Sequence, residues 1–574
     1  MSDTTNMIDC GQGVRLQRGV HCTLSDGTIL YSDHYHPAGT GRHPTLLMRQ
    51  PYGRDIASTV VYAHPVWFAR NGYNVVIQDV RGRGDSSGEF YPFRNEQKDG
   101  VETIAWLRAL PECTGKIGMY GFSYQGMTQW LAAAAQPEGL LCIAPAQTAH
   151  DLYNGWFYNH GVLRLASSLG WGLQMLKQDA RRLHLREASE ALERTWSSLP
   201  SQILHTPVAT HPAIQAKGLP TYVNDWLKHD QPDEYWAQID ISGQVDQIRI
   251  PALHLSGWYD TYLQGSIAGF RAICNRGGSQ EARDNQYLLA GPWAHIPWGN
   301  LIGAQDFGPN ANFDTDELLL RWFNHWLKDS GEFFTEPRIR YFAMNENEWH
   351  TADEWPSTNY TLYLRSEGRA NSSRGDGTLT PVPPQVSEPP DTFLVDPEVP
   401  VLAPGGITSA SGCYNQAALE LGNNLLTYTT TPFVTPFRVF GTPQVTLHTI
   451  TSAPFADLVV KLVCLRPNCD ADFICIGTAR STHLFADHYA PDTPHQWHFD
   501  LEPTAWVFAP GESLRIEIAG NAYPLYDRNP GASTKSSHAT SWDWQRSTHT
   551  IHHDPTKPSA LHLPVVERVE DPTQ

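Results

Sequence analysis

Lys116–Gly126 reads KIGMYGFSYQG, and this stretch decides the fold. A strand-like apolar run enters a Gly-Phe-Ser-Tyr-Gln-Gly turn, and the helical pattern Met127–Ala135 follows. A strand, a sharp turn with small residues and a helix are the setting in which a serine hydroxyl projects above a sheet as a nucleophile. Ser123 is therefore the candidate nucleophile. The common G-x-S-x-G pattern fails by one position, because Gln125 precedes the second glycine, Gly126.

The sequence before this turn alternates strand and helix signals. Val20–Leu24 and Thr28–Tyr35 predict a hairpin, and the apolar runs Thr45–Met48 and Tyr73–Gln78 predict buried strands. Residues 96–110 carry apolar side chains at helical spacing. Strands that alternate with helices imply right-handed crossovers and a mainly parallel sheet.

The pattern changes after this region and then returns. From about 146 to 240 strand signals vanish and helical spacing dominates, which predicts a helical insertion. Strand signals resume at Ile250–Leu255 and Gln286–Ala290, and Asp314–Lys328 predicts an amphipathic helix. The insertion therefore interrupts one α/β domain.

Beyond about residue 350 short strands replace helices, with Pro and Gly between them, while the Ser-, Gly- and Pro-rich residues 370–392 predict a surface loop. The predicted strands are Tyr360–Leu364, Thr392–Val395, Leu425–Thr429, Gln444–Thr449, Leu458–Leu465, Gln496–Leu501 and Ser513–Ile518. This spacing predicts an all-β sandwich or jelly roll. The expected domains are an α/β-hydrolase catalytic domain at 1–145 and 241–350, a helical cap at 146–240 and a jelly roll at 351–574.

A nucleophilic serine needs a histidine base and an orienting carboxylate. In an α/β-hydrolase these follow in the order Ser, Asp or Glu, His, at the carboxyl ends of strands. The strand at 250–255 leads to Asp260 and the strand at 286–290 leads to His295, which satisfies both conditions. His150-Asp151 is the best alternative pair, but it precedes the cap and comes too early in that order.

The oxyanion of the reaction also needs donors. The backbone N–H of Tyr124, directly after the nucleophile, is the expected first donor. The second normally comes from the loop after an early strand, which here is Arg49–Gly53. Its Tyr52 offers a phenolic O–H, and one such donor contributes about 3–4 kcal/mol in known enzymes.

Other polar clusters indicate no cofactor and no metal. His34-Tyr35-His36 places two histidines on one face of a strand, but no carboxylate or cysteine partner is evident, so we interpret it as an ordinary strand face. His552-His553-Asp554 is interpreted similarly, as part of a loop. Residues 81–84 (RGRG) lack the Lys-Ser/Thr of a phosphate loop and predict a structural loop held by Arg–carboxylate pairs.

Composition narrows the partners and the compartment. The 574 residues carry a net charge of −19, which disfavours nucleic acid and anionic membranes as partners. The first ten residues lack the basic and apolar regions of a secretory signal, and no run of about 18 apolar residues is present. Nine cysteines without a zinc spacing predict reduced thiols and a cytoplasmic protein.

Several motifs together make a resemblance specific. The chain resembles the cocaine-esterase / X-prolyl dipeptidyl-peptidase superfamily of serine hydrolases along essentially its whole length. The matching segments are Pro51-Tyr52, residues 79–84 (DVRGRG), 87–90 (SGEF), 121–126 (GFSYQG), 257–260 (GWYD), 291–295 (GPWAH) and 526–529 (YDRN). The resemblance implies the three domains above. It also implies the triad Ser123, Asp260 and His295, with the Tyr52 hydroxyl and the Tyr124 N–H as oxyanion hole.

The resemblance favours the cocaine-esterase-like branch. X-prolyl peptidases of the group carry a long N-terminal helical domain, whereas strand signals here begin by about residue 20. The resemblance also implies an aromatic acyl pocket in the cap, for which Trp156, Trp171 and Tyr262 are the candidates. Packing within the cap core is the alternative role for these three side chains.

The sequence thus predicts a serine esterase that acts through an acyl-enzyme on a small-molecule or short-peptide acyl substrate. Three alternatives stay open: an amidase or peptidase acting on peptides or β-lactams, an acyltransferase, and a binding protein with a vestigial site. A homodimer is also left open.

Overall fold

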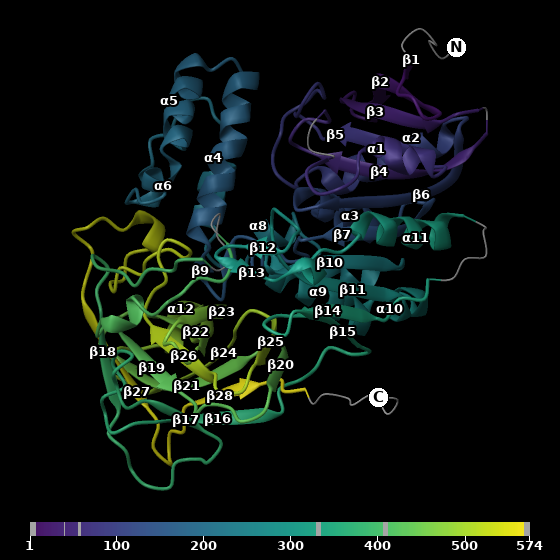
Figure 1. Ribbon diagram of the computed structural model, residues 1–574. Coiled ribbons are helices and arrows are strands. Elements are labelled where there is room, and N and C mark those ends of the chain that lie inside the picture. The colour runs from purple at the N-terminus through teal and green to yellow at the C-terminus, as the bar shows by residue number, and fades with distance from the viewer. Residues whose placement is uncertain (1–6, 40, 56–58, 329–333, 406–410, 567–574) are drawn as a thin grey trace, which may run out of the picture.

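Two large sheets organise the chain (Figure 1). The computed structural model describes residues 7–39, 41–55, 59–328, 334–405 and 411–566. The remaining residues, including the chain ends that the expected domains contained, lie outside this description. None of the helices in the described ranges combines the length and the apolar character needed to cross a bilayer.

The first sheet carries the predicted α/β pattern. Its strands, in spatial order, are β1 (Met7–Asp9), β2 (Val14–Thr23), β3 (Ile29–Pro37), β5 (Asn74–Asp79), β4 (His43–Gln50), β6 (Cys113–Phe122), β7 (Leu140–Ala146), β10 (Ala252–Tyr259), β11 (Gln286–Ala294), β14 (Ile339–Ala343) and β15 (Glu348–Ala352). The strands from β5 to β14 are parallel, and antiparallel strands flank them at both edges. This is the α/β-hydrolase arrangement that the sequence predicted.

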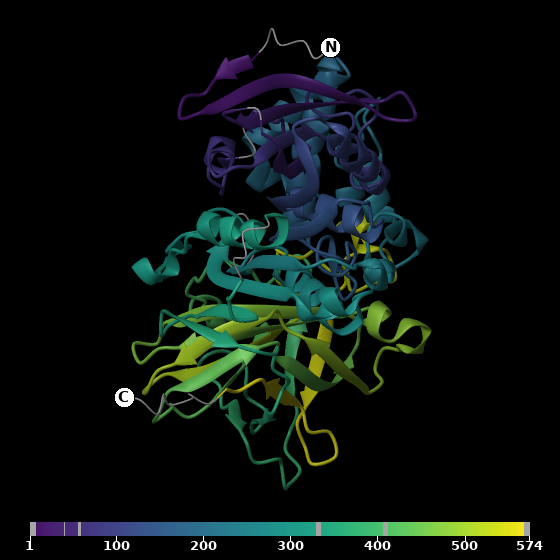
Figure 2. The same ribbon diagram turned by 90° about the vertical axis from the view of Figure 1, so that its right-hand side faces the viewer.

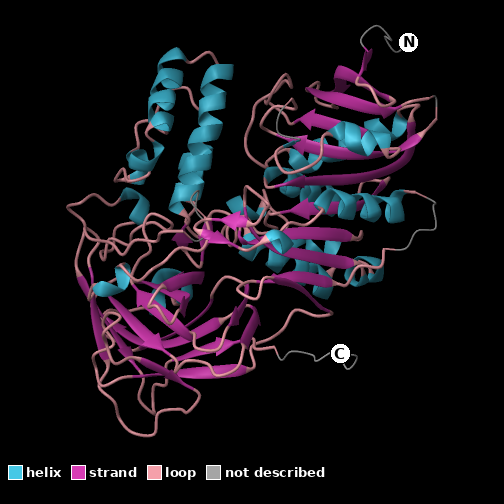
Figure 3. Cartoon of the chain, in the orientation of Figure 1, coloured by secondary structure: helices cyan, strands magenta, loops and turns pink. Residues whose placement is uncertain are grey.

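Helices cover both faces of this sheet, as Figure 3 shows. They are α1 (Pro65–Arg70), α2 (Glu96–Ala109), α3 (Tyr124–Ala134), α9 (Leu263–Arg276), α10 (Gln280–Asp284) and α11 (Thr315–Leu327). The buried strands are apolar on both sides because alternate side chains meet different layers. Leu47 packs in the core with Ile104 of α2, whereas Leu46 packs with Phe323 of α11.

The insertion is mainly helical, as predicted. It contains α4 (Leu165–Arg182), α5 (Arg186–Ser197), α6 (Leu199–Gln202), α7 (Tyr222–Lys228) and α8 (Glu234–Ala237). In Figure 1, α4 and α5 stand side by side as a long hairpin. The expectation that strands are absent was wrong in one place, because Tyr158–Asn159 (β8) pairs with Val162–Leu163 (β9). Two-residue strands are too short to leave a period-2 signal.

The second sheet forms the all-β part of the chain. Its strands are β18 (Asp391–Val395), β27 (Ser547–His552), β21 (Gln444–Thr451), β24 (His495–Asp500), β28 (Ala560–Leu563), β16 (Tyr360–Arg365), β17 (Thr378–Thr380), β19 (Leu425–Thr429), β26 (Ser513–Ala519), β22 (Asp457–Leu465) and β23 (Ala471–Arg480), and β20 (Phe437–Gly441) pairs separately with β25 (Thr504–Phe508). All seven predicted strands are present. The surface-loop prediction for residues 370–392 was incomplete, because β17 lies within it.

The two sheets share one core. Trp258 and Tyr259 of β10 lie in the same buried apolar cluster as Leu458 of β22 and Phe473 of β23. The Tyr259 hydroxyl also donates to the Phe473 carbonyl at 3.3 Å. In Figure 2 the all-β part packs directly beneath the first sheet. We propose to divide the chain into catalytic, cap and all-β domains near residues 146, 240 and 352, with an interface packed like a domain interior.

Candidate active site

Ser123 stands between β6 and α3 in a strained conformation. Its φ of 62° and ψ of −128° are unfavourable for a residue with a Cβ. The Ser123 N–H donates to the carbonyls of Ala146 and Gln147, at 2.9 and 3.2 Å, which pins the turn to the end of β7. The hydroxyl is thereby held at the carboxyl edge of the parallel sheet, where α/β folds bind their ligands.

The departure from the common serine pattern has a packing reason. A side chain at Gly121 would place its Cβ 2.5 Å from the Cβ of Gln125, and one at Gly126 would lie 2.6 Å from Thr148 Cγ2. The close approach to the segment that follows β7 thus falls at position 126 instead of 125. Gln125 is accommodated because its side-chain oxygen accepts the Phe122 N–H at 3.2 Å.

Asp260 and His295 meet at the same edge. His295 Nδ1 lies 2.6 Å from Asp260 Oδ1, and the other carboxylate oxygen accepts the Tyr262 N–H at 3.1 Å. A carboxylate only accepts, so Nδ1 carries the proton and Nε2 of a neutral ring presents a lone pair. The pair forms because β10 and β11 approach closely: a Cβ at Gly257 would lie 2.3 Å from the Trp293 carbonyl.

Gln147 connects the serine turn to both partner strands. Its N–H donates to Leu255 of β10 at 2.8 Å, and its side-chain amide donates to the Ala294 carbonyl, beside His295, at 3.0 Å. Its own carbonyl accepts the Ser123 N–H. The sequence analysis missed this residue. A polar residue directly after the apolar strand β7 was the available signal.

Tyr52 and Tyr124, the two predicted oxyanion donors, both lie next to Ser123. Burial raises the pKa of the Tyr52 phenol, partly offset by its contacts with Trp171 and the Ser123 side chain, so it stays protonated. The indole N–H of Trp171 donates to the Tyr52 oxygen at 3.2 Å, which leaves the phenol hydrogen free to point elsewhere. Tyr124 begins α3, where N–H groups lack helical acceptors.

The Tyr124 side chain anchors the turn from beneath. Its hydroxyl donates to Glu96 at 2.8 Å and accepts the Phe93 N–H at 3.1 Å. Glu96 is in turn paired with the fully buried Arg49 at 2.7 Å. The sequence analysis did not identify Glu96 or Arg49, because their partners lie on three different elements.

Comparison with known proteins finds matches along most of the chain. A model of the X-Pro dipeptidyl-peptidase (S15) family matches residues 26–297, and a model of the X-Pro dipeptidyl-peptidase C-terminal non-catalytic domain matches 332–562. The cocaine esterase of Rhodococcus sp. (strain MB1 Bresler) is 31% identical over 95% of this chain and 97% of its own length. The chain belongs to the X-Pro dipeptidyl-peptidase (S15) family.

Solved structures agree with this S15 fold. An aminopeptidase from a marine sediment Thaumarchaeota archaeon superposes with a TM-score of 0.79 at 21% identity, covering 96% of this chain and 97% of the other. An α-amino acid ester hydrolase superposes with a TM-score of 0.78 at 22% identity, covering 97% and 98%. This S15 protein is therefore a cocaine-esterase-like serine hydrolase of carboxylic ester or amide bonds.

In this S15 protein the three predicted pocket aromatics lie around the candidate site. The ring of Tyr262 stacks on Trp156 with centroids 3.9 Å apart, and it forms a T-shaped pair with the His295 ring, with centroids 5.2 Å apart. The ring centroids of Trp171 and Trp156 lie 5.8 Å apart, and the indole N–H of Trp171 donates to the Tyr52 hydroxyl. Trp156 is 1% exposed and Tyr262 is 5% exposed, so both side chains also pack in the core, which was the alternative role considered from the sequence.

The all-β part also reaches this region. Glu502, which follows β24, pairs with Arg164 at the start of α4 at 3.3 Å, and both are buried. Burial raises the pKa of Glu502 to about 7, an effect that Arg164 opposes and the Asp260 charge reinforces. Arg164 also donates to Gln264 of α9 at 3.1 Å. The cap, the catalytic domain and the all-β domain thus meet next to Asp260.

Two other sequence interpretations can be placed in the S15 fold. Burial lowers the pKa of His150 to about 4, and Asp151 accepts the Asn154 N–H, so this pair serves the local loop. The RGRG loop is held as predicted, since Arg81 pairs with Asp99 at 2.7 Å and Arg83 with Asp179 at 3.0 Å.

Proposed function

We propose that this S15 protein is an esterase in which Ser123, His295 and Asp260 form the triad and Tyr52 and the Tyr124 N–H form the oxyanion hole. The observation that carries the proposal is the strained Ser123 turn beside the Asp260–His295 pair. His295 Nε2 accepts the Ser123 proton during attack on the carbonyl carbon. It then protonates the leaving alcohol, and the acyl group stays on Ser123 Oγ.

Water completes the cycle by the same route. His295 takes a proton from water, hydroxide attacks the acyl carbon, and collapse returns the proton to Ser123 Oγ as the acid leaves. Tyr52 and the Tyr124 N–H stabilise the oxyanion in both halves. Asp260 keeps the proton on His295 Nδ1 throughout.

The carboxylates near the candidate site are paired, which supports a substrate with an uncharged acyl group. An aminoacyl substrate brings an ammonium group, which binds best to a free carboxylate in a dry site. Three carboxylates described above near the site are each paired: Asp260 is bound by His295, Glu96 by Arg49 and Glu502 by Arg164. The aromatic side chains Trp156, Trp171 and Tyr262 are instead suited to an apolar acid.

A matched substrate panel tests this preference. Aryl esters and anilides of benzoic and phenylacetic acid should be compared with aminoacyl and dipeptidyl esters and anilides. We expect kcat/KM to be at least about a hundredfold higher for the neutral aryl esters, because the ester leaving group departs more readily and no charge is buried. Faster turnover of aminoacyl or dipeptidyl anilides would contradict the proposal and favour a peptidase. An added amine or alcohol that captures most of the acyl group would indicate an acyltransferase.

Tyr52→Phe should lower kcat by about 100- to 1000-fold, with a much smaller change in KM, because the phenol hydrogen meets the oxyanion only in the transition state. Steady-state kinetics on an aryl ester measure this split. Tyr153→Phe is a matched control, since that cap phenol donates to the Asp230 carbonyl, and it should leave kcat unchanged. A Tyr52→Phe enzyme with wild-type kcat would remove Tyr52 from the mechanism.

The cysteines support a cytoplasmic location. All nine are free thiols in the structure, and six of them are buried. Unpaired thiols persist where the compartment is reducing. The homodimer considered from the sequence stays a prediction, which light scattering of the purified protein tests.

A further inference from the structure

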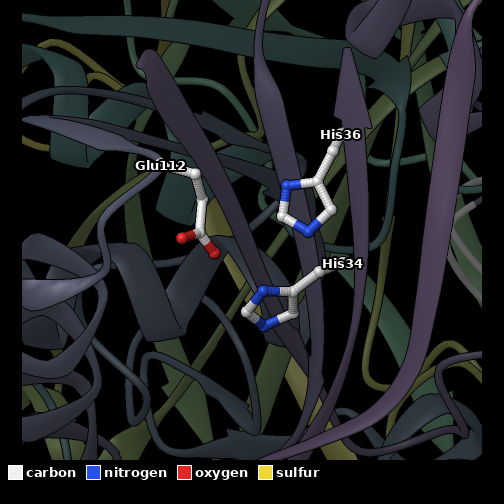
Figure 4. A group of neighbouring side chains, drawn as sticks. All are labelled: His34, His36 and Glu112. Atoms are coloured by element: carbon white, nitrogen blue, oxygen red, sulfur yellow. The ribbon is translucent and has the colours of Figure 1, made fainter. Parts of the chain in front are cut away.

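Three potential metal ligands converge at the edge of the first sheet that lies opposite Ser123. They are His34 and His36 on β3 and Glu112 in the loop before β6, and one ligand atom from each lies within 4.8 Å of the others (Figure 4). The sequence analysis interpreted the two histidines as an ordinary strand face because no third ligand was evident. The fold supplies that ligand.

The hydrogen bonds around His36 fix its tautomer. The Asn74 amide nitrogen donates to the carbonyls of Glu112 and His43, at 3.0 and 3.2 Å. Its oxygen must therefore face His36 Nδ1, which lies 3.1 Å away. An amide oxygen only accepts, so Nδ1 carries the hydrogen and Nε2 presents its lone pair.

The same reasoning applies to His34. The Ser32 hydroxyl lies 3.2 Å from the Val20 carbonyl, which takes its only hydrogen. The hydroxyl oxygen therefore accepts from His34 Nε2, at 2.9 Å. The proton sits on Nε2, and the lone pair of His34 lies on Nδ1. Each ring thus uses one nitrogen in a hydrogen bond and keeps the other as a potential ligand, which is the arrangement that outer partners impose on metal-binding histidines.

The third ligand, Glu112, is also available to an ion. The Glu112 carboxylate makes no hydrogen bond or ion pair with any described residue, while its backbone is held by His43 and Asn74. Glu112 is only partly buried, which leaves an ion a route from solvent.

We propose that His34, His36 and Glu112 form a binding site for Zn²⁺ or a similar transition-metal ion. Two imidazoles and one carboxylate are a common zinc set, with a fourth position for water. Bonds of about 2.1 Å in a tetrahedron require ligands about 3.4 Å apart. The ligand atoms lie within 4.8 Å of one another, so binding would require small rotations of these side chains toward the ion.

The position of the site indicates a structural role. β4, β5 and β6 begin at His43, Asn74 and Cys113, whereas Ser123 follows the end of β6. The ten residues of β6, at about 3.3 Å each, separate the cluster from Ser123 by roughly 30 Å. A bound ion would tie β3 to the loop before β6 across the intervening strands, and it would stabilise the folded state without entering the reaction.

Zinc binding to the full-length protein tests the proposal. After treatment with a chelator and its removal, isothermal titration with Zn²⁺ should give one tight site per chain. We expect Glu112→Gln and His36→Gln to weaken that site at least about tenfold. His21→Gln, on the neighbouring strand β2 and outside the cluster, is the matched control and should bind as the wild type does.

Thermal unfolding provides an independent readout. At a zinc concentration a hundred times Kd, the ratio of folded to unfolded protein should rise about a hundredfold in the wild type and in His21→Gln. Because Glu112 lies in a loop, the Glu112→Gln variant should fold normally without metal. It should show little of this zinc-dependent rise. Absence of a stoichiometric site would overturn the proposal. Undiminished binding by both cluster variants would also overturn it, since it would place the ion elsewhere, such as at Glu346, Glu348 and His350.

Discussion

Ser123→Ala is expected to lower kcat for an aryl ester by about a millionfold, the loss seen when a serine nucleophile is removed from a complete triad. The residual rate over water would come from the oxyanion donors and from substrate binding, which the change leaves in place. A fluorophosphonate probe should label the wild-type protein once, at Ser123, and should not label the variant. Intact-mass measurement gives both results from one sample.

Stability separates loss of the nucleophile from loss of the fold. Alanine retains the Cβ, so the strain at φ 62° is the same, and loss of the one hydroxyl should change the free energy of unfolding by no more than about 1 kcal/mol. Ser256→Ala is a matched control, because Ser256 is a fully buried serine of β10 outside the turn, and it should keep its activity and probe labelling. Turnover by Ser123→Ala near the wild-type rate would disprove the assignment of the nucleophile.

Asp260→Asn is expected to reduce kcat by about ten-thousandfold while KM changes little. The two oxygens of Asp260 accept from His295 Nδ1 and from the Tyr262 N–H. An asparagine that keeps the Tyr262 bond must turn its NH₂ toward His295, which then has to accept at Nδ1 and carry its proton on Nε2. The ring would have no lone pair for the Ser123 hydrogen.

Asp151→Asn distinguishes this explanation from a general effect of removing a buried acid. Asp151 belongs to the alternative His150-Asp151 pair, and its side chain accepts a backbone N–H within its own loop. We expect this variant to retain kcat within a fewfold of the wild type. If instead Asp151→Asn were inactive and Asp260→Asn active, the orienting carboxylate would have to be reassigned to the earlier pair.

The sequence was sufficient for the features that local patterns encode. The strand–turn–helix around Ser123 and the strand ends before Asp260 and His295 are short-range signals, and the order of strands in an α/β-hydrolase places them at one edge. Gln147 was not predictable in the same way, because its role depends on reaching β10 and β11 at once. Glu112 reaches His34 and His36 only after β4 and β5 have been placed between β3 and β6.

The strands missed in the all-β region have a similar cause. β17 has three residues, too few for a period-2 pattern. β23 is buried on nearly every residue, so it lacks the alternation of a half-exposed strand, and Gly477 interrupts its apolar run. Its side chains are buried because they pack against its neighbours and the first sheet, which is tertiary information.

The shared core of the two sheets constrains how this protein can evolve and be engineered. Because Tyr259 and Phe473 belong to one buried cluster, we expect that the all-β part cannot be exchanged like an independent module. A chimaera that takes its all-β half from a relative would have to bring complementary side chains on β10 with it. Substitutions on the two halves should therefore be accepted in pairs, and a shortened chain ending at β15 would expose an apolar surface that favours aggregation.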